Sequence, residues 1–199
     1  VEDYGSFVLG RMPANQVNAG DPGQEVLAER TQVTINNTSF DSALGEPDIP
    51  AELRSPADDP YYLVQFIGPI KTEWVEELQG LGAEVLGYHP SFTYLVRMTP
   101  AAADLARNTR AVQWVGKYHP AYRLPLEEEL KLAESRDGQV ALTVRFFEGV
   151  DSAALLNELA SHGAQATGLS EVEHIARLWV DPARVNELAA ISGIYLLEA

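Results

Sequence analysis

The feature that most constrains the fold is an internal repeat in the last two-thirds of the chain. Apolar and glycine positions of segment 63–114 return in segment 143–196. At an offset of 81, the recurring residues are Phe66, Leu78, Gly82, Ala83 and Gly87, which return as Phe147, Leu159, Gly163, Ala164 and Gly168. After one inserted residue the offset is 82, and Pro100, Val112 and Trp114 return as Pro182, Ile194 and Leu196. A repeat of this length predicts two copies of one supersecondary unit.

Each copy reads in the order strand, helix, strand, strand, helix, strand. In the first copy, a β-rich run at 61–67 precedes a helix with apolar side chains at helical spacing, capped by Thr72 and ended by Gly82. In the second copy, Asp151 caps the equivalent helix and Gly163 ends it. This order is that of the split βαβ motif. We therefore predict an α+β fold of two tandem βαββαβ, ferredoxin-like units, each an antiparallel sheet with helices on one face.

The segments outside the two copies have a different composition. Glycine and proline are dense before residue 61, which predicts an irregular, extended or mobile arm over 1–30 and a lead-in over 40–60 that wraps on the first unit. Residues 31–35 alternate and predict one strand. An acidic run predicts a short helix at 126–134. The expected divisions are an N-terminal arm and lead-in at 1–60, a first repeat at 61–118, a linker at 119–138 and a second repeat at 139–199.

The charge of the chain limits its partners. The 29 acidic residues outnumber the 14 basic ones, which gives a formal net charge of -15. Nucleic acids and anionic membranes are bound by clustered Lys and Arg, so we expect neither as a partner. No apolar run reaches the roughly 18 residues of a membrane-spanning helix. The start of the chain, Val1-Glu2-Asp3-Tyr4, does not have the pattern of a signal peptide.

No group of residues has the pattern of a catalytic or metal site. The chain has no cysteine, no Gly-flanked nucleophilic serine, no pair of histidines at metal-binding spacing and no phosphate-binding glycine motif. His89 and His119 share a Tyr-His-Pro context. We interpret it as the end of an edge strand, because proline stops a ladder, and the alternative is a metal or acid–base pair. We expect no catalytic residue, no metal and no cofactor in this chain.

Several of these strands resemble one known family. Residues 62–70, 82–85, 94–98 and 112–118 resemble the N-terminal prodomains of secreted bacterial subtilisin-like serine proteases. The second copy is similar to the propeptide-inhibitor domain of these proteases in its strand–helix order, in Gly163-Ala164 and in residues 194–198. The resemblance implies a non-catalytic intramolecular chaperone and inhibitor within a secreted precursor, whose signal peptide is not in this chain. It implies the cognate subtilisin-like catalytic domain as the partner and serine endopeptidase activity for the full precursor.

The resemblance also implies where the partner binds. In this family the open sheet face packs on two helices of the catalytic domain, acidic residues near the second strand cap those helices, and the C-terminal tail lies in the active cleft. The matching positions are Glu171 and Glu173 before the third strand, and Leu197, Glu198 and Ala199 at the end of the segment. The segment stops directly after its last strand, so we expect weak inhibition by this piece alone. It also has two units where simple subtilisin propeptides have one.

Two functions from other classes fit the same fold. Paired βαββαβ units also form small-molecule-sensing modules, and a metabolite that stabilises the chain against heat would favour that alternative. An acidic chain also suits an extracellular protein-interaction domain without a protease partner. An enzyme is the least favoured alternative, because no constellation of residues meets the geometric roles of an active site.

Overall fold

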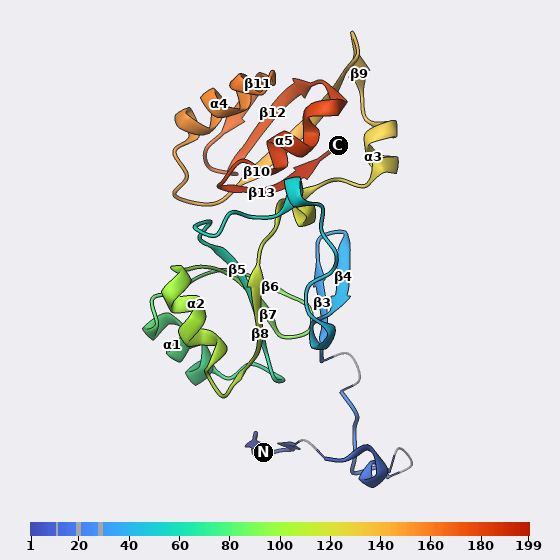
Figure 1. Cartoon of the computed structure of the whole chain (residues 1–199), viewed down its shortest axis with the longest axis vertical. Helices are drawn as coiled ribbons and strands as arrows, with labels where there is room; N and C mark the ends of the chain where they lie inside the picture. Colours follow the sequence, from blue (N-terminus) through green and yellow to red (C-terminus); the bar gives the residue numbers. More distant parts are fainter. Residues whose placement is uncertain (11, 19–20, 28–29) are drawn as a thin grey trace.

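The computed structural model describes residues 1–10, 12–18, 21–27 and 30–199. The protein is an α+β structure in which the paired strands are antiparallel. The two copies of the repeat lie end to end along the long axis, and the N-terminal residues lie at the end far from the second copy (Figure 1).

The first copy forms a four-stranded sheet with two helices on one face (Figure 1). The strands follow one another in the sheet as β6-β7-β5-β8. Its elements are β5 (Tyr61–Phe66), α1 (Thr72–Gly80), β6 (Glu84–His89), β7 (Thr93–Arg97), α2 (Pro100–Arg107) and β8 (Val112–Lys117).

The second copy repeats this arrangement. The order of its main strands is β11-β12-β10-β13, so that each copy places its third strand beside its first and its fourth strand at an edge. Its elements are β10 (Gln139–Phe146), α4 (Ser152–Ser161), β11 (Gln165–Ser170), β12 (Ile175–Val180), a 3-10 turn (Pro182–Arg184), α5 (Val185–Ala189) and β13 (Ile194–Glu198).

Most of the helix ends follow from local chemistry. Asp151 accepts hydrogen bonds from the first backbone N–H groups of α4, as its sequence position predicts. Gly82 and Gly163 follow α1 and α4 with φ of 92° and 83°, a backbone conformation that costs glycine little. The prediction for Thr72 is wrong by one residue, because Lys71 is the N-cap of α1 and its side chain makes no capping bond.

The offset between the two copies is also wrong in the first strand. Phe66 donates its backbone N–H to the carbonyl of Phe92, and Phe146 donates to that of His174. Phe66 and Phe146 are both buried under the helices, whereas Phe147 lies in a different apolar cluster. The equivalent of Phe66 is therefore Phe146, at an offset of 80. A shift of one residue in a strand moves a side chain to the other face of the sheet.

The lead-in begins earlier than predicted, at about residue 31, and it contains a hairpin that covers the first sheet. The predicted strand is β3 (Gln32–Ile35), and it pairs with β4 (Thr38–Asp41), which the sequence did not predict. Asn36 in the turn has a positive φ of 47°, a conformation that asparagine tolerates better than most residues. Figure 1 shows the hairpin on the side of the first sheet opposite α1 and α2.

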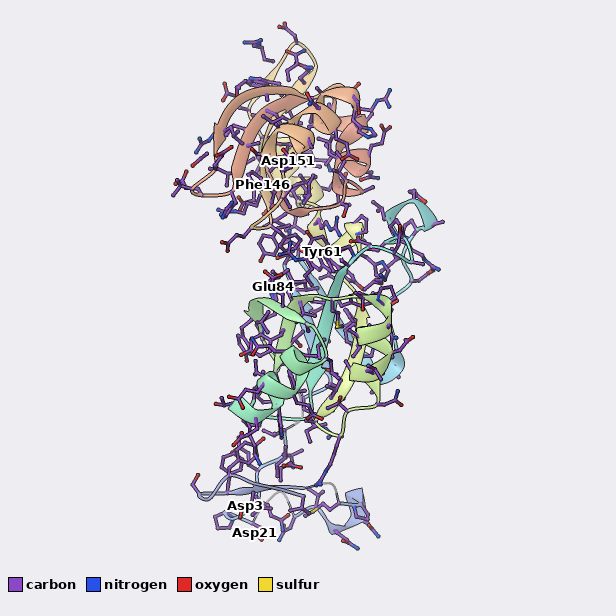
Figure 2. The ribbon with its side chains drawn as sticks, turned by 90° about the vertical axis from the view of Figure 1, so that its left-hand side faces the viewer. Asp3, Asp21, Tyr61, Glu84, Phe146 and Asp151 are labelled. Atoms are coloured by element: carbon purple, nitrogen blue, oxygen red, sulfur yellow. The ribbon has the colours of Figure 1, made fainter. Side chains whose placement is uncertain are left out.

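The first ten residues contact the far end of the first unit. They contain β1 (Glu2–Asp3) and β2 (Val8–Leu9), which pair with each other. Glu2 forms ion pairs with Lys71 at 3.1 Å and with Arg110 at 3.0 Å. Figure 2 shows Asp3 at this end of the molecule.

The linker contains three short elements, of which the first lies between the units and the other two lie along the second unit (Figure 1). They are a 3-10 helix (Pro120–Arg123), α3 (Glu127–Leu132) and β9 (Ser135–Arg136). Arg123 is fully buried and donates to the carbonyls of Ala189 at 3.2 Å and Ile191 at 3.1 Å in the second unit. It also donates to Asp59 Oδ2 at 3.2 Å and to the carbonyl of Tyr118 at 2.9 Å. One guanidinium therefore binds both units.

Aromatic side chains complete the contact between the units. Tyr61 of the first unit stacks on Phe147 of the second with ring centroids 4.1 Å apart. The Tyr118 hydroxyl donates to the carbonyl of Tyr195 at 2.6 Å. Figure 2 shows Tyr61 at the end of the first unit nearest to the second. Both contacts bury apolar surface, so the two units share a core here. In the described part of the chain, no helix is long and apolar enough to cross a membrane.

Candidate functional site

The sheet face opposite the helices is covered in the first unit. Leu63, Gln65, Thr93 and Leu95 on this face have almost no exposure. The polar Gln65 is satisfied there, because its amide donates to the carbonyl of Gln32 at 3.2 Å and its oxygen accepts from Ser42 Oγ at 2.5 Å. Apolar residues of the lead-in pack in the same cluster, and they are Val33, Ile35, Phe40, Ile49 and Leu53. The chain itself therefore occupies this face.

The same face of the second unit is uncovered. The strand registers show which positions of the two units are equivalent. Leu63 pairs with Leu95 on one side and with Gly116 on the other, and Thr143 pairs in the same way with Arg177 and Glu198. Thr143 is therefore equivalent to Leu63, and Arg177 is equivalent to Leu95. In the same way Gln65 corresponds to Arg145. Arg145 and Arg177 are exposed, and Thr143 is half-buried. The first unit buries this face, polar and apolar residues alike, whereas the second unit exposes Arg145 and Arg177 to solvent.

Two arginines and a tryptophan dominate this surface, which we call the uncovered face. It consists of Ala141, Thr143 and Arg145 of β10, Arg177 and Trp179 of β12, and Leu196 and Glu198 of β13. Arg145 Nε lies 2.7 Å from Glu198 Oε2, and both side chains are more than two-fifths exposed. Trp179 is half-buried, and the Arg136 guanidinium lies 5.4 Å from its ring centre, in cation–π range.

The two predicted acidic residues lie in the turn between β11 and β12. Both are exposed. Glu171 Oε1 accepts a hydrogen bond of 2.8 Å from Ser152 Oγ, and Ser152 is the first residue of α4. The Glu173 side chain is at the surface, and its backbone N–H donates to Ser170 Oγ at 3.3 Å. Glu171 therefore contacts the N-terminus of a helix of its own unit.

The three predicted C-terminal residues have different environments. Leu197 is 1% exposed and packs under the helices of the second unit. Its side chain lies on the inner face of the sheet, because Leu197 pairs with the core residue Val144 of β10. Glu198 is on the uncovered face with Arg145. Ala199 lines an open pocket on that face together with Thr143, Arg177 and Trp179.

The two Tyr-His-Pro histidines lie in different places. His89 is the last residue of the edge strand β6, as interpreted from the sequence. Burial lowers its pKa below the ordinary histidine value. His119 is buried, its Nδ1 accepts from the Ser55 N–H at 2.9 Å, and its Nε2 lies 3.2 Å from Glu46 Oε2. That hydrogen bond lowers the pKa of the Glu46 carboxyl. His119 thus attaches the lead-in to the first unit.

A second hollow lies between the units. It is an open pocket of about 380 Å³ lined by the β6 edge of the first unit and by Phe146, Phe147, His174 and Tyr195 of the second. Among the described residues, no group of three or more His, Asp or Glu side chains is placed to hold a metal ion.

Sequence reasoning missed the residues that join the units and also Arg145, Arg177 and Trp179 of the uncovered face. Nothing in the sequence around Arg123 or Asp59 distinguishes a buried ion pair from two surface charges. A signal for the uncovered face did exist. Strand β10 alternates Val140, Leu142 and Val144 with polar or small residues, a pattern typical of a sheet with one face in water.

A family model described as a domain of unknown function (DUF8729) matches residues 27–119 of the chain. The match includes the lead-in hairpin and the whole first unit, and it covers just under half of the 199 residues. No curated protein matches the chain. The family segment joins the hairpin to the first sheet, and the two are also packed together in one apolar cluster.

Proposed function

We propose that this chain is the non-catalytic prodomain of a secreted subtilisin-like serine protease precursor, and that it assists the folding of the catalytic domain and inhibits it. Each βαββαβ copy would be a ferredoxin-like unit, and the second would be the propeptide-inhibitor-like one. The strand orders β6-β7-β5-β8 and β11-β12-β10-β13 support this assignment, because both equal the order of a split βαβ unit.

The observation that carries the proposal is the difference between the two sheet faces. The first unit buries this face of its sheet under residues of the same chain, so the face is not accessible to a partner. The second unit has the same sheet with this face uncovered, and the face presents Arg145, Arg177 and Trp179 at the surface. The second unit is therefore the one suited to a catalytic domain, and the first unit would support it.

The buried contacts between the units support this division of roles. Arg123 and the stacked pair Tyr61 and Phe147 connect the second unit to the first without using the uncovered face. Glu171 and Glu173 lie at one end of that face, in the turn between β11 and β12. The exposed Glu173 carboxylate would approach a helix N-terminus of the partner, where negative charge is favoured, and Glu171 would do so only on leaving its hydrogen bond with Ser152.

The test is refolding of the catalytic domain encoded in the same precursor. The denatured domain is diluted into buffer with the full chain, with an unrelated acidic protein of similar size, or with nothing added. We expect the chain alone to raise the yield of active protease several-fold and then to slow hydrolysis of a chromogenic peptide. An unchanged yield together with unchanged hydrolysis overturns the proposal, and so does a precursor without a subtilisin-like catalytic domain.

A further inference from the structure

We propose that Arg145 and Arg177 make the uncovered face of the second unit specific for a partner surface that presents carboxylates. The inference rests on the proposed function, because it names the chemistry of the surface that the catalytic domain would offer. It differs from what the family resemblance implies, in which the prodomain contributes the acidic groups and the partner contributes helix N-termini.

The first unit acts as an internal reference for a covered face. At the positions equivalent to Arg145 and Arg177 it has Gln65 and Leu95, both fully buried beneath the lead-in. The occupant of that face is apolar, with Phe40 and Ile35 against the sheet. An apolar occupant of the same kind would bury the Arg177 guanidinium together with the Arg145–Glu198 ion pair, at a large desolvation cost. A partner that binds the second face therefore differs in chemistry from the lead-in that covers the first.

The distribution of charge shows that these arginines are unusual for the chain. Residues 139–199 contain eight acidic residues and three basic ones, and two of the three basic side chains lie on this single face. In a chain with a net charge of -15, the two arginines outweigh Glu198 on this face and mark the region where a negatively charged surface can approach.

The geometry of the face supplies both charge and apolar contact. Thr143 lies between Arg177 on one neighbouring strand and Glu198 on the other. Arg145 is held by Glu198, whereas the exposed Arg177 head lies beside the pocket lined by Trp179 and Ala199. A carboxylate of the partner can form a two-pronged contact with Arg177, and an adjacent apolar side chain can pack on Trp179.

The experiment measures inhibition of the precursor's catalytic domain by the full chain and by charge-reversal variants. Arg145→Glu/Arg177→Glu is compared with Arg184→Glu, in which an exposed arginine of the same unit is changed in the turn before α5. We expect the double reversal to raise the inhibition constant about 100-fold and to reverse its dependence on salt, while Arg184→Glu stays within twofold. Circular dichroism and thermal midpoints check that each variant is folded.

The outcomes separate the inference from the proposed function. If the unmodified chain neither inhibits nor assists folding, the proposed function fails, and this inference fails with it. If the unmodified chain inhibits and the double reversal inhibits equally well, only the inference is overturned. If the double reversal instead abolishes self-association in sedimentation velocity with no effect on inhibition, the occupant is a second copy with its acidic surface, and the inference is again overturned.

Discussion

The buried guanidinium between the units gives the sharpest prediction for stability. Changing Arg123 to Met removes four hydrogen-bond contacts, to Asp59, Tyr118, Ala189 and Ile191. It leaves the Asp59 carboxylate, whose side chain is 4% exposed, without its ion pair. Breaking a buried pair in this way costs about 3–5 kcal/mol. At roughly 2–4 °C per kcal/mol for a chain of this size, the melting temperature should fall by about 6–20 °C.

Urea unfolding of Arg123→Met, followed by circular dichroism and tryptophan fluorescence, measures this loss. Arg107→Met is the matched control, because Arg107 forms an exposed pair with Asp104 on one helix and should cost less than about 1 kcal/mol. In Arg123→Met/Asp59→Asn, the uncompensated carboxylate is gone, and we expect recovery of part of the stability. A loss below about 1 kcal/mol in Arg123→Met would refute the assignment of this residue as the main polar link between the units.

Three further predictions concern single positions. Phe40→Ala opens a cavity between the lead-in and the first sheet and should cost about 3–5 kcal/mol in urea unfolding; a cost below 1 would mean that the hairpin is not packed there. Gly163→Ala should lower the free energy of unfolding by about 1 kcal/mol or more, because φ of Gly163 is 83°. The control Gly80→Ala, at the end of α1, should raise the free energy of unfolding. Equal effects of the two substitutions would contradict this reasoning. Burial lowers the pKa of His89, so its contribution to stability is complete above about pH 6.5 and is lost as the pH falls further. His89→Asn should therefore flatten the dependence of the melting temperature on pH between about pH 5 and 7. An unchanged pH dependence would exclude His89 as the cause of the loss of stability in acid.

The helices and strands of the two units could be predicted because their signals are local. Asp151 and Gly163 mark the ends of α4 by capping chemistry that needs no tertiary context. Strand register could not be predicted in the same way. Phe146 and Phe147 are adjacent and identical in type, and only the ladder to His174 and Gly193 decides which one is equivalent to Phe66.

The candidate site depended on long-range packing, which the sequence does not reveal. Gln65 looks like a surface residue in an apolar strand, yet the lead-in buries it completely and satisfies its amide. Leu197 is predicted at the partner-binding end of the chain, but its pairing with Val144 places its side chain in the core. The acidic residues Glu171 and Glu173 could be located from the turn between two strands, because that turn is local.

The most direct test of the central claim is hydrogen–deuterium exchange of the full chain with and without the catalytic domain of the proposed precursor. A prodomain that binds through the uncovered face should gain protection in β10, β12 and β13, while the exchange of the hairpin β3–β4 stays unchanged. Protection confined to α4 and α5, or no change anywhere at concentrations that saturate inhibition, would contradict the account.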